Sequence, residues 1–540
     1  MAVLNKANIR DKEVWKKIGV TLPSFDYDAL RAETYKNPRW VHIGPGNIFR
    51  GFVAAVAQRA LEEGVMTSGI TALCTFDHQI LEKIYDPCDD LSLQVIMHAD
   101  GKLDKTVIAS IGESLKADAS DAAAWERAKV IFSTPELQMV SFTITEKGYH
   151  IKNMDGAFYP DVLSDFERKT EVPKNGMAIV ADLLYTRYKA GAHPIAIVSM
   201  DNFSHNGDKL YDSISTIAQK WCENGLVEQG FVDYLADRTK VGFPCSMIDK
   251  ITPRPDPTVS RELAESGFES TELVITDKGT YIAPFVNAEA PQYLVIEDSF
   301  PNGRPALKDT GVYFTDRKTV DLVERMKVCT CLNPLHTSLA IFGCLLGYTS
   351  IAAEMKDECL APLVHKIGYD EGMPVVADPK IINPMDFVKE VIDVRLPNPF
   401  IPDTPQRIAT DTSQKLAIRY GETIKLYRQS SELDVESLKY IPLTIAGWCR
   451  YLMGLDDNGE TMAISSDPLL EQLQGYIKDI KLGDPASMGE RLHPILSNER
   501  VFGSDLYADG LGARVEQYFV RMIAGPGAVR KTLTEEVLCK

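Results

Sequence analysis

The sequence lacks the cysteine patterns by which many proteins bind metals. None of its ten cysteines forms a Cys-x-x-Cys pair, and none has a histidine at zinc-finger spacing. Cys329 and Cys331 are two residues apart, but on a helix their thiols point in different directions, so we expect no metal site there. Scattered thiols are typical of proteins in a reducing compartment, and we therefore expect a cytoplasmic protein.

Long apolar runs are missing as well. No segment approaches the eighteen or more apolar residues of a membrane span. The first seventeen residues are charged throughout and lack the apolar core of a signal peptide. The net charge of −18 argues against nucleic-acid or anionic-membrane partners, since neither is attracted to an acidic surface. We expect a monomer or small homo-oligomer that binds a small molecule.

The pattern of apolar residues divides the chain into two parts. Strands expected at 40–43, 69–76, 107–111, 139–145 and 194–199 alternate with helices such as 122–129 and 176–190, which predicts a parallel, doubly wound sheet. Beyond about residue 312 the pattern is mainly helical. We therefore predict an α/β protein: a Rossmann-like domain with an N-terminal arm over 1–311, a mainly helical domain over 312–540, and an active site in the cleft between them.

A glycine turn follows the first strand of the predicted sheet. The turn runs Gly44-Pro45-Gly46-Asn47-Ile48-Phe49-Arg50-Gly51 and leads into a helix. Such a strand, turn and helix bind a pyrophosphate, because glycines let the backbone approach closely and the helix start offers free N–H groups. The spacing departs from the usual six-residue pattern, since the third glycine is Gly51.

An acidic residue follows the next predicted strand. Asp77 stands where a dinucleotide's ribose diol is bound and where a 2′-phosphate is repelled. Together with the glycine turn it favours NAD as the cofactor. The alternative is an ordinary loop acid after a strand.

Two polar clusters follow later strands of the same sheet. One spans 143–149 and contains Glu146; the other spans 200–207 and contains Asn202. Ligands collect at the carboxyl ends of parallel strands, and an amide there can polarise a carbonyl group. A hydrogen-bonded turn is the competing interpretation of the second cluster.

The segment 324–337 places four polar groups in an otherwise apolar run. The groups are Glu324, Lys327, Asn333 and His336. Polar groups in apolar surroundings are costly unless they have a partner or a task. One helix is expected to end near residue 332 and a second to begin at Asn333-Pro334, with Asn333 and His336 on one face. Alternatively, the amide is only a helix cap, the imidazole a core residue and the lysine a surface residue.

A cationic segment follows a proline-rich loop. Arg407 and Lys415 together suit a carboxylate or several hydroxyl groups, and Asp411 or Thr412 is expected to cap the helix that carries Lys415. A charged loop that docks the helix by salt bridges explains the pattern equally well.

Several motifs in this order give the chain a resemblance to the polyol-specific long-chain dehydrogenases over nearly its whole length. They are Gly44-x-Gly46 with Phe49-Arg50, Asp77, Thr145-Glu146-x-Gly148-Tyr149, Asp201-Asn202 with Asn206-Gly207, Phe243-Pro244 with Asp249 and Ile251-Thr252-Pro253, the set Glu324, Lys327, Asn333 and His336, and Arg407-Ile408-Ala409 with Asp411, Ser413 and Lys415. The family usually has four residues between lysine and asparagine, and this chain has five. We place the extra residue in a bulge or looser turn before Pro334.

The resemblance implies metal-independent hydride transfer with NAD. By resemblance, Lys327 is the general acid/base, Asn202 and Asn333 hold the oxyanion, and His336 orients the substrate while Glu324 passes the proton to water. The implied substrate-binding residues are Arg407, Lys415 and Asp249. The implied cofactor-binding residues are Gly44, Gly46, Asn47, Ile48, Phe49, Arg50, Asp77 and Glu146.

The substrate is left open among related sugars. The chain looks closest to the branch that converts D-fructuronate and NADH to D-mannonate and NAD⁺; mannitol/fructose and tagaturonate/altronate are the alternatives. Two other classes compete with this reading. They are a non-catalytic NADH-sensing protein, which has no need of a base with paired amides, and a metal-dependent alcohol dehydrogenase, for which the sequence lacks a ligand set.

Overall fold

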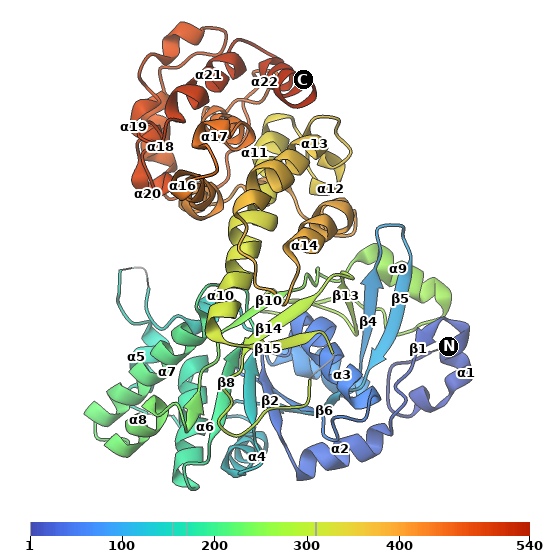
Figure 1. The fold of residues 1–540 in the computed structure, drawn as a ribbon. Coiled ribbons are helices and arrows are strands. Elements are labelled where there is room, and N and C mark those ends of the chain that lie inside the picture. The colour runs from blue at the N-terminus through green and yellow to red at the C-terminus, as the bar shows by residue number, and fades with distance from the viewer. Residues whose placement is uncertain (1, 154, 169, 308–309, 540) are drawn as a thin grey trace. The chain divides into compact units, whose positions relative to one another are not determined.

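The computed structural model describes residues 2–153, 155–168, 170–307 and 310–539. The chain forms two compact units, Met1–Val320 and Asp321–Lys540 (Figure 1). The first includes β15 (Val312–Thr315), because this strand pairs in parallel with β14 (Tyr293–Glu297). The structure therefore divides the chain after Val320, nine residues later than the boundary after residue 311 that the sequence pattern indicates.

A six-stranded parallel sheet is the centre of the first unit. Its order is β6-β3-β2-β7-β8-β9, and every neighbouring pair in it is parallel. The chain starts in the middle and winds outward in both directions, which is the Rossmann arrangement expected from the sequence. The strands are β2 (Trp40–Ile43), β3 (Ile70–Cys74), β6 (Ile111–Lys116), β7 (Met139–Phe142), β8 (Ile195–Ser199) and β9 (Val241–Gly242).

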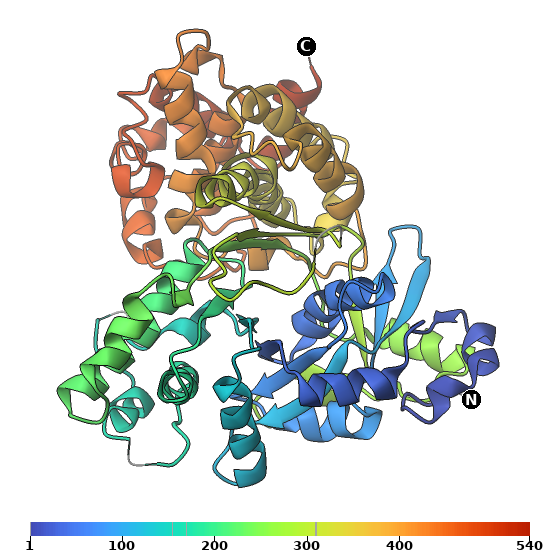
Figure 2. The same cartoon turned by 60° about the horizontal axis from the view of Figure 1, so that its bottom comes forward.

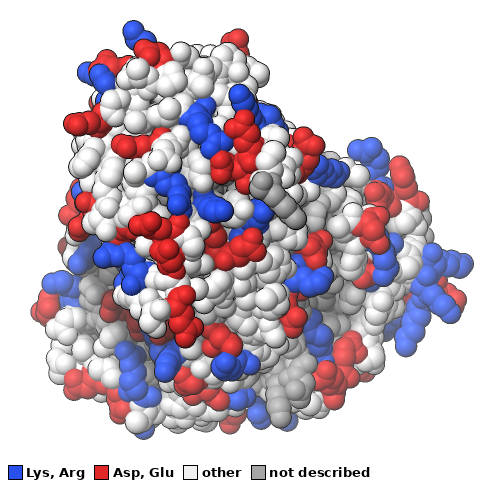
Figure 3. Space-filling model, turned by 45° about the horizontal axis from the view of Figure 1, so that its top comes forward, with Lys and Arg blue, Asp and Glu red and all other residues white. Residues whose placement is uncertain are grey.

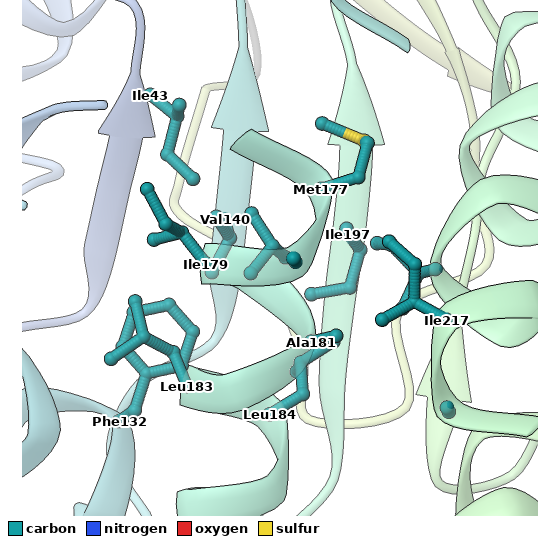
Figure 4. Close-up of a cluster of buried hydrophobic side chains, with 14 of the residues drawn as sticks. Ile43, Phe132, Val140, Met177, Ile179, Ala181, Leu183, Leu184, Ile197 and Ile217 are labelled. Carbon is teal, nitrogen blue, oxygen red and sulfur yellow. The ribbon is translucent and has the colours of Figure 1, made fainter. Parts of the chain in front are cut away.

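Separate apolar cores cover the two faces of this sheet. Val140 and Ile197 point to one face, where α6 (Gly176–Lys189) packs Ile179 and Leu183 against them (Figure 4). The neighbouring residues in the same strands belong to the second core, beneath α3 (Ala54–Glu62). Strand side chains alternate between faces, so strands covered on both sides read as continuous apolar runs. This is why four of the five strands expected from the sequence are confirmed.

The fifth expected strand, 107–111, is wrong as a single element. β5 (Leu103–Ile108) ends in it and β6 begins at its last residue, and the two strands belong to different sheets. Ser110 lies at the junction and donates a hydrogen bond to the Ala54 carbonyl oxygen (2.6 Å). An apolar run cannot reveal such a change of sheet, because both strands are buried there.

Smaller sheets and further helices complete the first unit (Figure 2). The sheets have the orders β1-β5-β4-β13 and β10-β14-β15, and β11 pairs with β12. The remaining strands are β1 (Val20–Thr21), β4 (Ser92–Met97), β10 (Ser246–Asp249), β11 (Val274–Ile275), β12 (Tyr281–Ile282) and β13 (Phe285–Ala288). The other α-helices are α1 (Lys12–Lys17), α2 (Tyr27–Lys36), α4 (Ala122–Ser133), α5 (Pro160–Asp165), α7 (Asn206–Glu223), α8 (Gln229–Ala236) and α9 (Pro257–Ser266).

The second unit is helical in the residues described, as expected. Its centre is α11 (Asn333–Leu345), which packs against α17 (Tyr440–Tyr451). Gly447 lets the two helices approach, because a Cβ there would lie 2.7 Å from the Phe342 ring. The other α-helices are α10 (Arg317–Arg325, which begins in the first unit), α12 (Ile351–Glu354), α13 (Leu360–His365), α14 (Pro384–Glu390), α15 (Pro405–Ile408), α16 (Glu422–Gln429), α18 (Leu470–Ile477), α19 (His493–Leu496), α20 (Glu499–Phe502), α21 (Gly512–Met522) and α22 (Ala528–Leu533).

One helical stretch, Arg317–Leu345, is long and apolar enough to cross a membrane by length and composition. The expectation from the sequence, that no segment comes near this, is wrong by that measure. Of its most apolar window, 83% is buried inside the protein, as in a core helix. On the face in Figure 3, acidic and basic side chains are interspersed.

A carboxylic acid lies buried in the second unit without a hydrogen-bond partner. Both carboxyl oxygens of Glu354 are enclosed, and the side chain lies so close to Gly343 that a Cβ there would clash with it. Burial, and secondarily the nearby Asp357, raises the pKa of Glu354 to about 9. The acid therefore stays protonated in the folded protein at neutral pH.

Replacing Glu354 by Gln tests this assignment. Between about pH 4.5 and pH 9 the unfolded chain ionises this group while the folded protein keeps it protonated, so the free energy of unfolding falls as pH rises. Glu354→Gln removes this loss, and we expect its gain in stability over the wild type to grow by about 3 kcal/mol from pH 5.5 to pH 8. Urea unfolding at the two pH values measures it, with exposed Glu358→Gln as the control. A difference from wild type that does not change with pH would contradict the assignment.

Candidate active site

The three glycines of the turn after β2 suit their positions for three different structural reasons. Gly44 has φ +95°, and a Cβ there would lie 2.3 Å from the Thr143 carbonyl oxygen. A Cβ at Gly46 would meet nothing within 4 Å, so the backbone there is open to a ligand. A Cβ at Gly51 would lie 2.8 Å from the Thr252 methyl group. Tight turn, open approach and close packing are the roles of the glycines in a dinucleotide-binding turn, so these residues fit that ligand despite the altered spacing.

The side chains after the turn point into the protein. Phe49 is buried and stacks on the His42 imidazole, with 4.1 Å between ring centroids. Arg50 is buried and donates to the Ala283 carbonyl oxygen (2.7 Å) and to the Asn47 amide oxygen (2.8 Å). If Phe49 and Arg50 contribute to cofactor binding, they do so through their backbone groups and by stabilising the turn, not through direct side-chain contacts. Ile48 is half-buried.

Asp77 is held by residues about 200 positions further along the chain. Its Oδ2 accepts hydrogen bonds from the Thr276 hydroxyl (2.6 Å) and the Thr280 hydroxyl (2.5 Å). The side chain is nearly buried, and none of the described residues donates to Oδ1. The carboxylate is thus fixed through one oxygen, and the other is left for a ligand.

Asp201 joins the two polar loops that follow β7 and β8. Its carboxylate accepts hydrogen bonds from the Ile144 N–H (2.8 Å), the Thr145 N–H (3.3 Å) and the Tyr149 hydroxyl (2.6 Å). Thr145 has φ +69° and ψ 156°, a strained conformation for a residue with a side chain. Strain of this kind persists only where the surroundings hold it, and Asp201 supplies that restraint. Glu146 follows and is exposed.

Asn202 lies in the second of these loops and is exposed. The Asn206 amide group stabilises this loop by donating hydrogen bonds to the Asp201 carbonyl oxygen (2.9 Å) and the Ser246 carbonyl oxygen (3.1 Å). Asp249 is buried at the end of β10, the strand that contains Ser246. The structure therefore connects the loops after β7 and β8 to the start of β10 at Ser246, whereas Asp249 lies at the other end of that strand.

Lys327 lies in a π-helical turn of the second unit. The turn spans Met326–Cys331, between α10 and α11, and the Lys327 side chain is only 3% exposed. A π-helical turn holds one more residue per turn than an α-helix and is often found at functional sites. The π-helical turn covers most of the segment between Lys327 and Asn333, where we expect a bulge or looser turn. Glu324 lies one turn earlier, is half-buried, and precedes Arg325, which pairs with Glu422 (3.0 Å).

α11 starts at Asn333-Pro334, as expected, but its N-cap residue is Leu332 and not Asn333, which is the first helical residue. Asn333 and His336 are both half-buried in its first turn. The His336 Nε2 lies 3.9 Å from Asp403 Oδ2. Burial, assisted by Arg419, Arg395 and Arg407 and opposed by Asp403, lowers the pKa of His336 to about 4. The imidazole is therefore neutral at neutral pH and able to exchange hydrogen bonds with a hydroxyl group.

Arg407 and Lys415 lie near His336 in the same unit. Arg407 forms an ion pair with Asp403, and the Lys415 ammonium donates to the Thr410 carbonyl oxygen. Burial, together with the nearby cations Arg419 and Arg407, lowers the pKa of Lys415. The expected helix cap is absent: Asp411 is left-handed (φ +54°) without a capping bond, and only a short 3₁₀ turn, Thr412–Gln414, follows.

Arg419 was missed by the sequence analysis. Its guanidinium donates to the Thr337 hydroxyl (2.6 Å), next to His336, and none of the described carboxylates pairs with it. Burial lowers its pKa to about 10. A half-buried cation without a counter-ion among the described residues is available to an anionic ligand. Its four-residue distance from Lys415 was the only available signal, and that spacing is common on surface helices.

No group of three or more His, Cys, Asp or Glu side chains able to hold a metal occurs among the described residues. Apart from Cys222, which is half-buried, and Cys539, which is exposed, the cysteines are buried, and all ten are free thiols.

Comparison with known sequences identifies both units. A model of the mannitol dehydrogenase Rossmann domain matches residues 38–309, and one of the mannitol dehydrogenase C-terminal domain matches residues 319–523. The D-mannonate oxidoreductase of Thermotoga maritima is 55% identical over 536 residues, which cover 99% of both chains. The mannitol 2-dehydrogenase of Cereibacter sphaeroides is 30% identical over 471 residues, 86% of this chain and 89% of the relative.

A solved structure agrees with these matches. The mannitol 2-dehydrogenase of Pseudomonas fluorescens, in a ternary complex with NAD and D-mannitol, has a TM-score of 0.69 and 25% identity, with 99% of each chain covered. A substrate-free D-sorbitol dehydrogenase has a TM-score of 0.77 at 23% identity, covering 96% of this chain and 97% of that one, and supports the fold alone.

The two glycines of the turn separate stability from ligand binding. In Gly44→Ala the new methyl group would clash with the Thr143 carbonyl at a positive φ, so we expect about 3 kcal/mol of lost stability. In Gly46→Ala the methyl group meets open space, so the melting temperature should change little while the affinity for NADH falls tenfold or more. Thermal unfolding and NADH fluorescence titration check both. Unchanged NADH binding by Gly46→Ala would contradict the role of this turn.

Proposed function

Because the chain belongs to the mannitol dehydrogenase family, we propose that it interconverts D-fructuronate with NADH and D-mannonate with NAD⁺. Family membership makes it an NAD-dependent secondary-alcohol dehydrogenase. The observation that carries the choice of substrate is the 55% identity, along 99% of both chains, to a protein named D-mannonate oxidoreductase. The mannitol 2-dehydrogenase relative, at 30% identity, makes the mannitol/fructose pair the second candidate; tagaturonate reduction is a further alternative.

The proposed chemistry needs no metal and uses the side chains named above. In the oxidative direction the Lys327 amine accepts the proton of the substrate hydroxyl, and it returns this proton in the reductive direction. Bound NAD⁺ supplies the acceptor for the hydride that leaves the carbinol carbon. The amides of Asn202 and Asn333 donate to the substrate oxygen as negative charge develops on it. Glu324 passes the proton on to water.

Burial of Lys327 supports its role as the acid/base. The Lys327 side chain is only 3% exposed in a π-helical turn of mostly buried residues, and a lysine that exchanges a proton benefits from such surroundings. Neutral His336 supports its role in orienting a substrate hydroxyl. Asp249 is proposed as a further substrate-binding residue, and Asn47, Ile48 and Glu146 as cofactor-binding residues.

The cations of the second unit favour an anionic substrate. Arg407 pairs with Asp403, whereas Arg419 has no carboxylate partner among the described residues. A substrate carboxylate is the group that a guanidinium binds best, because two N–H groups match two oxygens. Arg407, Lys415 and Arg419 together are proposed to bind the acid end of the sugar.

We further propose that the enzyme works in the cytoplasm. Its ten cysteines are all free, which is typical of a reducing compartment. Its substrate is a small molecule, and its acidic net charge gives no attraction for nucleic acid or an anionic membrane.

A substrate panel tests the proposed function directly. D-Fructuronate, D-tagaturonate and D-fructose are assayed with NADH, and D-mannonate, D-altronate and D-mannitol with NAD⁺. We expect kcat/KM to be at least tenfold higher for D-fructuronate than for the other two ketoses. A preference for D-fructose would instead favour the mannitol/fructose candidate.

Arg419→Gln tests the binding of the acid end. We expect kcat/KM for D-mannonate to fall about 100-fold, equivalent to about 2.7 kcal/mol, mainly through KM. Activity on D-mannitol, where measurable, should change much less. Exposed Arg500→Gln is the control. An equal loss on the acid and the neutral polyol would assign Arg419 a purely structural role.

A further inference from the structure

The β11–β12 hairpin is fastened to the loop that follows β3. Besides the two threonine hydroxyls on Asp77, the Gln79 amide donates to Asp277 Oδ2 (2.6 Å) and accepts from the Asp277 N–H (3.0 Å). The Lys278 ammonium donates to the Phe76 carbonyl oxygen (2.6 Å). A two-stranded hairpin is marginally stable alone, so these bonds give it a fixed position.

The hairpin is fastened at the adenosine end of a Rossmann site. β3 lies beside β2, whose glycine turn suits the pyrophosphate, and Asp77 stands where the ribose hydroxyls are bound. The Oδ1 atom of Asp77 accepts no hydrogen bond from the described residues and can accept one from a ribose hydroxyl. The hairpin therefore places residues 276–280 near the position expected for the 2′-oxygen of the adenosine ribose.

The Lys278 ammonium has no carboxylate partner in the part of the chain that the structure describes. It lies 3.9 Å from the centroid of the Phe76 ring, which is 68% exposed, and none of the described residues forms an ion pair with it. The neighbouring basic groups have acidic partners: Lys116 pairs with Glu82 (2.7 Å), and the His78 Nδ1 lies 3.4 Å from Asp118 Oδ2. Lys278 is thus an ordered, unneutralised positive charge next to the ribose-binding acid.

We propose that Lys278 binds the 2′-phosphate of NADP(H), so that the enzyme uses NADPH as well as NADH. An ammonium is a good point-charge partner for a phosphate. It offsets the repulsion that Asp77 alone would exert on the 2′-phosphate, while Asp77 Oδ1 still accepts a ribose hydroxyl in NADH. The exposed Phe76 ring offers the adenine an apolar surface.

The proposal rests on the cofactor part of the proposed function and not on the identity of the sugar. It is tested by fluorescence titration of NADH and NADPH on the full-length protein without any sugar. For the wild type we expect the two Kd values to lie within about 30-fold of each other. Lys278→Gln should weaken NADPH binding at least tenfold and NADH binding less than threefold, and exposed Lys83→Gln should leave both unchanged.

Each other result has a definite meaning. If NADPH does not bind the wild type, or if Lys278→Gln alters both cofactors equally or neither, the assignment of Lys278 is overturned while the proposed function stands. If NADH itself does not bind the wild type, the proposed function fails. Lys278→Arg, which keeps the charge, should retain NADPH binding, so a loss there as large as in the Gln variant also contradicts the proposal.

Discussion

The burial of one lysine in a π-helical turn is the constraint on which the rest of the structure depends. The π-helical turn Met326–Cys331 lies between α10 and α11 in the helical stretch Arg317–Leu345, whose most apolar window is 83% buried. α11 begins two residues after the turn, at Asn333. An enclosed amine is costly for folding. The proton exchange with a substrate that we propose for Lys327 gives a reason why the fold tolerates this cost.

Burial shifts the pKa values of several ionisable groups in the second unit. It lowers the pKa of His336 to about 4, so the imidazole is neutral, and it also lowers the pKa values of Lys415 and Arg419. An anionic ligand would balance the charge of Arg419, which is why we propose a sugar acid as the substrate. The first unit contributes a rigid frame, in which Asp201 and Asn206 fix the loops that carry Thr145 and Asn202.

Much of the fold and part of the candidate site were predictable from the sequence, because the residue patterns that indicate them are local. The apolar strands and the glycine turn with Gly44 and Gly46 each follow from neighbouring residues, whereas the bulge before Asn333 was expected from the resemblance to the family. What could not be predicted depends on long-range pairing. Thr276 and Thr280 bind Asp77 across about 200 residues, and Arg419 reaches Thr337 across 82. The inward direction of Arg50 was equally hidden, since a basic residue after a glycine turn suits a phosphate as readily as a buried carbonyl group.

Chemical rescue of Lys327→Ala tests the central claim most directly. The variant should bind NADH normally and lose activity by about 1,000-fold or more, within the range expected for a missing acid/base. Added primary amines should then restore D-mannonate oxidation, with a rate that rises with amine basicity among amines of similar size. Full activity of the variant without any amine would contradict the account, as would an inactive variant that binds NADH normally and that no amine restores.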